Sequence, residues 1–117
     1  MVKHSDVVLN RTFAALADPT RRALLRQLAK GAAPMGELAE PFGMSWPAIT
    51  KHVKTLERAK LVRREQDGRV HRMHLVAAPM RSARAWLDDY EAFWQQRFDR
   101  LDALLKQDDA RAKGPRR

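Results

Sequence analysis

The sequence predicts a mainly α-helical fold with one small β-hairpin: four short helices, a two-stranded hairpin and one long C-terminal helix. Three observations carry this prediction. Helix-capping residues divide the first half of the chain, one Asp-Gly pair follows the fourth helical stretch, and apolar residues recur at spacings of three and four over about 80–107.

The first two helices are expected at 6–17 and from Pro19 onward. Three apolar residues share one face of the first helix: Leu9, Phe13 and Leu16. Asp18 can accept a hydrogen bond from the free amides of the second helix, and Pro19 suits its first turn because the missing N–H would be unpaired there anyway. Gly31 is expected to end this helix in the left-handed conformation.

A short third helix at 35–42 and a fourth at 45–58 follow with almost no connection between them. Pro41 removes a backbone hydrogen bond, so the last turn of the third helix should be distorted. Gly43 can turn the chain, and Ser45 is a good N-cap for the fourth helix. Two helices joined by about three residues that include a glycine are typical of a helix-turn-helix.

The chain then changes period from helical to alternating. Segments 61–66 and 69–76 are expected to form a hairpin through Asp67-Gly68, a pair typical of a type I′ turn with positive φ at both positions. A long helix is expected at 80–107, which completes a winged helix-turn-helix domain over 1–107. The polar segment 108–117 contains Gly-Pro and is expected to be a disordered basic tail.

Composition favours an anionic partner. The chain has 117 residues, enough for one domain, and 23 Lys and Arg against 14 Asp and Glu give a net charge of +9. Segment 45–72 alone carries eight basic and three acidic residues, a net +5. The absence of cysteine excludes disulfides and thiolate metal sites, and no apolar run is long enough to span a membrane. We expect a soluble, cytoplasmic protein without a cofactor.

The fourth helix has two contrasting faces. Ile49, Val53 and Leu56 should pack inward, which leaves short polar groups and cations on the outer side. Such a face suits the major groove, since short side chains allow close approach and lysines reach phosphates or guanine acceptors. The predicted DNA contacts of this helix are Ser45, Trp46, Pro47, Thr50, Lys51, His52, Lys54 and Arg58.

Each of these assignments has a plainer alternative. The cations could simply form a solvated helix face. Trp46 could pack over the turn from the third helix, the reading that we favour, or stack on a sugar or a thymine methyl group. In the hairpin, Arg69, His71 and Arg72 are predicted to reach a neighbouring minor groove, although basic residues also serve to prevent edge-strand pairing.

The long C-terminal helix carries a wide apolar stripe that so small a domain can cover only in part. We expect this stripe, with the first helix, to form a homodimer interface. The predicted interface residues are Leu9, Phe13, Trp86, Leu87, Tyr90, Phe93, Trp94, Phe98, Leu101 and Leu105. An alternative that can coexist is a pocket for an apolar small-molecule effector between subunits, lined by aromatic residues and Met80.

Three segments carry a resemblance to a known family: FAALADPTRRALLRQLAKG, MGELAEPFGMSWPAITKHVKTLERAKLV and REQDGRVHRMHL. From about Val8 to Leu75 the chain resembles the ArsR-type (arsenic-repressor-like) winged helix-turn-helix regulators of prokaryotes. The resemblance implies a homodimer that represses transcription from a palindromic operator in double-stranded DNA. It matches Ser45, Trp46, Pro47, Thr50, Lys51 and His52 to the family's recognition helix, and Arg69 and His71 to its wing.

The chain departs from the metal-sensing members of that family, which carry Cys-x-Cys in the third helix or ligand sets that include histidine at the dimer interface. Here the third helix reads Gly36-Glu37-Leu38, and the last helix has acidic residues but no histidine. We therefore expect no metal site. No nucleophile, phosphate-binding or zinc-protease motif is present either, so an enzyme is not expected. The other readings are a winged helix that binds DNA or RNA without sequence preference, and one that binds only protein.

Overall fold

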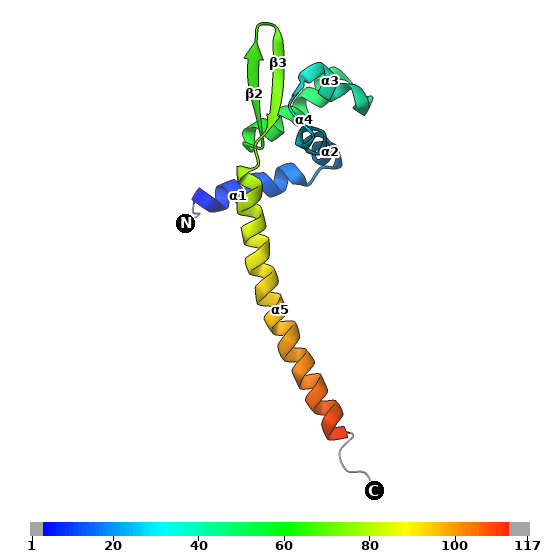
Figure 1. The fold of residues 1–117 in the computed structure, drawn as a ribbon, viewed down its shortest axis with the longest axis vertical. Coiled ribbons are helices and arrows are strands. Elements are labelled where there is room, and N and C mark those ends of the chain that lie inside the picture. Colours follow the sequence, from blue (N-terminus) through cyan, green and yellow to red (C-terminus); the bar gives the residue numbers. More distant parts are fainter. Residues whose placement is uncertain (1–3, 113–117) are drawn as a thin grey trace. The chain divides into compact units, whose positions relative to one another are not determined.

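A computed structural model of the chain describes residues 4–112, which divide into one unit up to Ala83 and a second from Arg84. Figure 1 shows the order of the elements. They are α1 (His4–Leu16), α2 (Pro19–Ala29), β1 (Ala33–Pro34), α3 (Met35–Ala39), the 3₁₀ turn η1 (Glu40–Phe42), α4 (Trp46–Arg58), β2 (Val62–Asp67), β3 (Val70–Leu75) and α5 (Ala78–Ala112). The order of four helices, a hairpin and a long helix is as predicted.

Capping determines where α2 begins and ends. The Asp18 carboxylate accepts a hydrogen bond from the Arg21 amide at 3.0 Å, and Pro19 occupies the first turn, as the sequence predicts. The expected left-handed cap at Gly31 is wrong. Lys30 closes the helix with its own amide, and Gly31 has a φ of 151°, far from the left-handed helical value, because the chain leaves directly toward β1.

The helix-turn-helix joint has the geometry that its sequence predicts. After α3 the chain tightens into η1, since Pro41 cannot donate the backbone hydrogen bond that a further α-helical turn would need. Gly43 then takes the left-handed conformation with a φ of 59°. Ser45 caps α4 by accepting a hydrogen bond from the Ala48 amide at 3.3 Å, so α4 begins one residue later than expected.

The end of α4 is closed by a left-handed residue that is not glycine. Lys60 has a φ of 62°, and its amide donates to the Glu57 carbonyl at 3.0 Å. The next amide, that of Leu61, donates to the Leu56 carbonyl, also at 3.0 Å. These two bonds form a Schellman motif, and the fully buried side chains of Leu56 and Leu61 supply the apolar contact that accompanies it.

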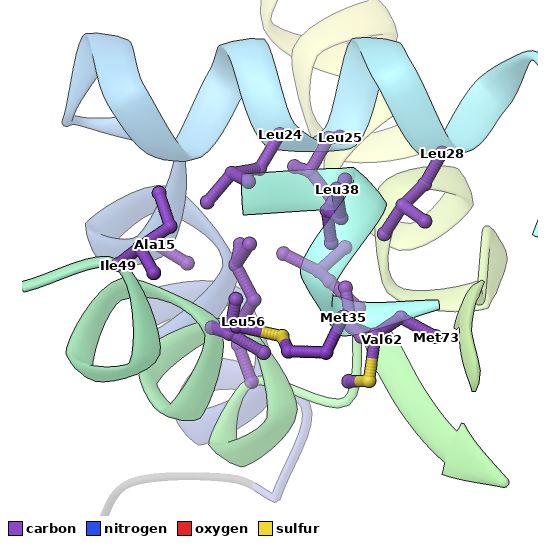
Figure 2. Packing of buried hydrophobic residues seen from close by; sticks show 13 residues of the cluster. Ala15, Leu24, Leu25, Leu28, Met35, Leu38, Ile49, Leu56, Val62 and Met73 are labelled. Atoms are coloured by element: carbon purple, nitrogen blue, oxygen red, sulfur yellow. The ribbon is translucent and has the colours of Figure 1, made fainter. Parts of the chain in front are cut away.

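One apolar core holds the first unit together. Figure 2 shows leucines of α2 directed toward the same interior as Ile49 and Leu56 of α4. Ile49, Val53 and Leu56 are at most 1% exposed, which confirms the predicted inner face of α4. The buried cluster consists of Ala15, Leu24, Leu25, Leu28, Met35, Leu38, Ile49, Val53, Leu56, Ala59, Leu61, Val62 and Met73.

The wing is a three-stranded antiparallel sheet rather than the expected two-stranded hairpin, in the order β1-β3-β2. The strand that was not predicted, β1, has two residues, which are too few to show any periodicity. It pairs only with Met73 and Arg72 of β3. The predicted type I′ turn is also wrong. Because Asp67 pairs with Val70, the turn residues are Gly68 and Arg69, and of these only Gly68 has a positive φ. That pattern is typical of a type II′ turn.

The last helix is longer than predicted at both ends. α5 begins at Ala78 because Pro79 is compatible with a first turn, and it continues to Ala112 instead of ending near 107. Residues 108–112 contain no glycine or proline, which explains why the expected disordered tail is wrong for them. The rest of that segment, 113–117, lies outside the described residues.

Candidate nucleic-acid interface

The outer face of α4 presents cations to solvent. Lys51, Lys54 and Arg58 are all exposed, opposite the buried stripe. Ser45 and Pro47 are exposed at the N-terminal end of the helix, and Ser45 also caps it. A firmly packed helix therefore carries short groups at one end and positive charges along its length, which is the form of a major-groove reading element.

One flank of α4 forms a groove of about 600 Å³ with the wing. Trp46, Thr50 and Lys54 line it from α4, and Arg69 and His71 line it from the wing. Trp46 is 54% exposed, so the expectation that it packs over the turn is wrong. Its place in the first turn, on the flank rather than on the inner face, leaves the indole accessible.

The wing distributes its basic residues over two faces. Arg69 is exposed in the turn itself, and His71 is half-buried on the same side as the buried Met73. Arg72 is exposed and does not line the groove, because successive side chains of a strand point to opposite faces. His74 lies beside Glu65, with its Nε2 atom 3.2 Å from Oε2.

The opposite flank of α4 is tied to the start of α2. The Nδ1 atom of His52 lies 3.4 Å from the Arg21 guanidinium and 3.8 Å from the Asp18 carboxylate. The Arg21 amide lowers the pKa of Asp18 below its usual value, desolvation opposes that shift, and the His52 charge adds to it. His52 therefore faces α2 instead of joining the groove, and its predicted DNA contact stays a prediction.

The wing flank has a second network that the sequence did not reveal. Arg64 on β2 donates two hydrogen bonds to Glu57 of α4, from Nη2 to Oε1 at 2.8 Å and from Nε to Oε2 at 3.3 Å. Its Nη1 atom lies 3.3 Å from Nδ1 of His71. The hydrogen bond to Glu57 raises the pKa of Arg64, and desolvation opposes that shift. The spacing of these two residues in the sequence does not predict their contact, because the conformation of the turn between α4 and β2 determines whether their side chains meet.

The part of α5 in the second unit exposes its apolar stripe. Trp86 and Tyr90 stack with ring centroids 5.4 Å apart, and Trp94 contacts both Tyr90 and Phe98 at 5.9 Å. The large residues of the stripe that are about half exposed include Leu104, which the prediction missed. They are Trp86, Leu87, Tyr90, Phe93, Phe98, Leu101, Leu104 and Leu105.

Two other predicted features fall in the first unit. Leu9 and Phe13 of α1 are half-buried. Met80 lines a shallow groove of about 310 Å³ whose surface is almost entirely apolar, together with Leu16, Leu25 and Leu75. This groove has no aromatic residue in its lining, so it is not the predicted effector pocket between subunits, and that pocket stays a prediction.

Within residues 4–112, no three histidine or acidic side chains come together as metal ligands. Over the same part of the chain, no helix is both long enough and apolar enough to cross a bilayer.

Comparison with known proteins decides the family. A helix-turn-helix domain model matches residues 16–65. The transcriptional repressor SdpR of Bacillus subtilis is 30% identical over 79 residues, which are 68% of this chain and 88% of SdpR. A crystal structure of an ArsR family transcriptional regulator is 41% identical with a TM-score of 0.72, over 75% of this chain and 97% of that one. The chain belongs to the ArsR family.

A further match, to an HTH-type regulator, is shorter. The HTH-type transcriptional regulator Rv2034 of Mycobacterium tuberculosis is 47% identical over 53 residues, 45% of this chain, and the match spans only 50% of the relative's length. Family membership confirms the predicted winged helix-turn-helix fold and identifies the chain as an ArsR-type transcriptional regulator.

Proposed function

We propose that this chain is a sequence-specific, homodimeric repressor that binds a palindromic operator in double-stranded DNA. In this proposal α4 enters the major groove, and the wing follows the adjacent minor groove with Arg69 at its tip. One observation carries it: Lys51, Lys54 and Arg58 are exposed together on the outer face of the second helix of a helix-turn-helix. The proposal places the protein in the bacterial cytoplasm, where the chromosome lies.

Charge distribution supports a nucleic-acid ligand over a protein ligand. More than half of the net charge of +9 belongs to segment 45–72, which contains α4 and the hairpin. Such a local positive field attracts phosphates, and the release of their counterions makes binding steeply dependent on salt. Binding to a protein would not require cations on a helix face that fits the major groove of DNA.

The exposed stripe of α5 supports the dimer. Half-exposed Trp86, Tyr90 and Phe98 on one helix face form an exposed apolar patch, a feature that marks protein–protein contacts. A two-fold axis through paired copies would place two recognition helices in successive major grooves, about 34–36 Å apart. Half-site spacing in the operator should then match one turn of DNA.

The experiment is a binding titration on duplexes that the protein selects from a random pool, with scrambled duplexes of equal length beside them. We expect the selected duplex to bind at least about a thousandfold more tightly. Changing both Lys51 and Lys54 to alanine should weaken binding and reduce its salt dependence by about two counterions. Changing Lys30 to alanine, an exposed lysine at the end of α2, is the matched control.

Two results would contradict the proposal. Equal affinity for selected and scrambled duplexes would favour an architectural or RNA-binding winged helix. Binding that stays weak for all duplexes at low salt would favour a protein partner.

A further inference from the structure

The pair of Glu57 and Arg64 connects the two parts of the candidate interface. Glu57 lies in the last turn of α4 and Arg64 lies on β2, and two hydrogen bonds of 2.8 and 3.3 Å join them. Both side chains are partly shielded from solvent, at 27% and 31% exposed. A bidentate contact between guanidinium and carboxylate restrains orientation as well as distance.

The outer part of the wing has few other restraints. β1 pairs only with Met73 and Arg72, so from Glu65 to His71 the hairpin has only its own β2–β3 ladder. Every residue from Glu65 to Val70 is exposed. The Arg64 side chain meets α4 just where the hairpin leaves the core, and it also contacts His71 on the neighbouring strand at 3.3 Å.

The contact between Glu57 and Arg64 lies beside the groove between α4 and the wing. Arg64 lines the groove together with Thr50 and Lys54 of α4 and with Arg69 of the turn. If Arg64 lost its partner on α4, the hairpin could rotate about its base, and Arg69 would move relative to Lys54. The position of the wing charges over DNA then depends on Glu57.

Considered by its charge alone, Glu57 would weaken DNA binding rather than support it. It is one of three acidic residues in the most basic segment of the chain, 45–72, so its charge opposes binding to a polyanion. We propose that Glu57 and Arg64 are positioning residues that hold the wing at the angle specific operator binding requires, and that Arg64 acts through Glu57 rather than on a phosphate. This inference rests on the proposed DNA-binding function.

Two substitutions of Glu57 separate position from charge. Glu57→Gln removes the charge and keeps the size, whereas Glu57→Asp keeps the charge and shortens the reach by one methylene. Positioning predicts that both variants bind the selected duplex about tenfold more weakly, with affinity for scrambled duplex no lower than before. A pure charge effect predicts tighter binding for Glu57→Gln and unchanged binding for Glu57→Asp. Asp67→Asn, the same charge change on an exposed residue beside the wing turn, is the control and should not weaken binding.

Arg64→Gln, combined with the Glu57 variants, completes a double-mutant cycle for the pair. If Arg64 acts through Glu57, this variant loses specific affinity without changing the salt dependence, and the double variant binds no worse than either single one. A salt dependence reduced by about one counterion would instead make Arg64 a phosphate contact and overturn the inference.

A measurement on the free protein keeps the inference testable if the proposed function fails. Backbone ¹⁵N relaxation of 66–70 should show lower order parameters in Glu57→Gln and Glu57→Asp than in the unchanged chain, and no decrease in Asp67→Asn. If the hairpin stays equally rigid in the Glu57 variants, the inference that Glu57 and Arg64 position the wing is wrong, even if the chain binds DNA. Failure to distinguish selected from scrambled DNA by the unchanged chain overturns only the proposed function.

Discussion

The guanidinium of Arg21 lies 3.4 Å from Nδ1 of His52, so a residue of α2 meets the flank of α4 opposite the wing. The same Arg21 donates to the carbonyl of Ala15 at 2.8 Å and to that of Ala14 at 3.0 Å. These carbonyls belong to the last turn of α1, where backbone acceptors have no partner within the helix. The Arg21 side chain therefore binds two carbonyls at the end of α1 and also contacts α4, while Arg22 donates to the Leu16 carbonyl at 2.7 Å.

We expect Arg21→Ala to destabilise the fold by about 1–3 kcal/mol, the usual cost of removing charge-assisted hydrogen bonds to partly buried acceptors. Urea unfolding followed by circular dichroism measures the change. Arg26→Ala is the control, because Arg26 is exposed on the same helix and should change stability by less than about 0.5 kcal/mol. Equal losses in the two variants would show that the bonds of Arg21 add nothing to stability.

Asp18 should make stability depend on pH in the acid range. Its folded-state pKa is lowered, chiefly by the hydrogen bond from the Arg21 amide. The charged carboxylate therefore stabilises the fold fully above the unfolded pKa of about 3.9, and this stabilisation is lost as pH falls through the lower folded value. Thermal unfolding between pH 6 and 2.5 tests this. Asp18→Asn keeps the capping geometry without titrating, so its melting temperature should fall less over that interval. Parallel curves for the two proteins would contradict the assignment.

Lys60 occupies a conformation that favours glycine, with a φ of 62° after the last turn of α4. We expect Lys60→Gly to stabilise the fold by about 0.5–1 kcal/mol, because the left-handed conformation costs a residue with a Cβ more than it costs glycine. Lys60→Ala removes the same charge but keeps the strain, and should not be stabilising. Chemical unfolding curves of the three proteins measure the differences. A Lys60→Gly protein no more stable than Lys60→Ala would refute the prediction.

The dimer should depend on the exposed stripe of α5. Phe98 is 57% exposed and lies on that stripe, so Phe98→Glu should place a charge in the proposed interface and convert the dimer to monomer at micromolar concentration. Gln96→Glu adds the same charge on the opposite side of the helix and should leave the dimer intact. Sedimentation velocity distinguishes the two. A dimer that survives Phe98→Glu, or a chain that is monomeric without any substitution, would place the interface elsewhere.

Prediction from the sequence was most reliable where a single residue has one physical consequence within its own turn of chain. Ser45, Asp18 and Pro41 each act within a single turn of chain, and the structure confirms the two caps and the distorted turn. It was wrong where several conformations satisfy the same local rule. An Asp-Gly pair suits a type I′ turn, but the register that pairs Asp67 with Val70 moves the turn forward by one residue.

Among the candidate site residues, periodicity identified the outward lysines and the buried stripe of α4, because a helix repeats regularly. It could not identify Glu57, which the sequence presents only as an acid among bases. The resemblance to the ArsR family placed His52 among the DNA contacts, although that side chain meets Arg21 and Asp18. Contacts between elements depend on how the elements pack, and no spacing rule reports that.

The order of elements, the N-caps of α2 and α4, the inward face of α4 and the concentration of positive charge in 45–72 all follow from the sequence alone. Each of these follows from chemistry within a few residues or from a regular repeat. The strand β1, the turn at Gly68 and the two networks that flank α4 could be seen only in the folded structure. Those features depend on how separate elements pack or pair in register, and their energy exists only once the fold has brought the elements together.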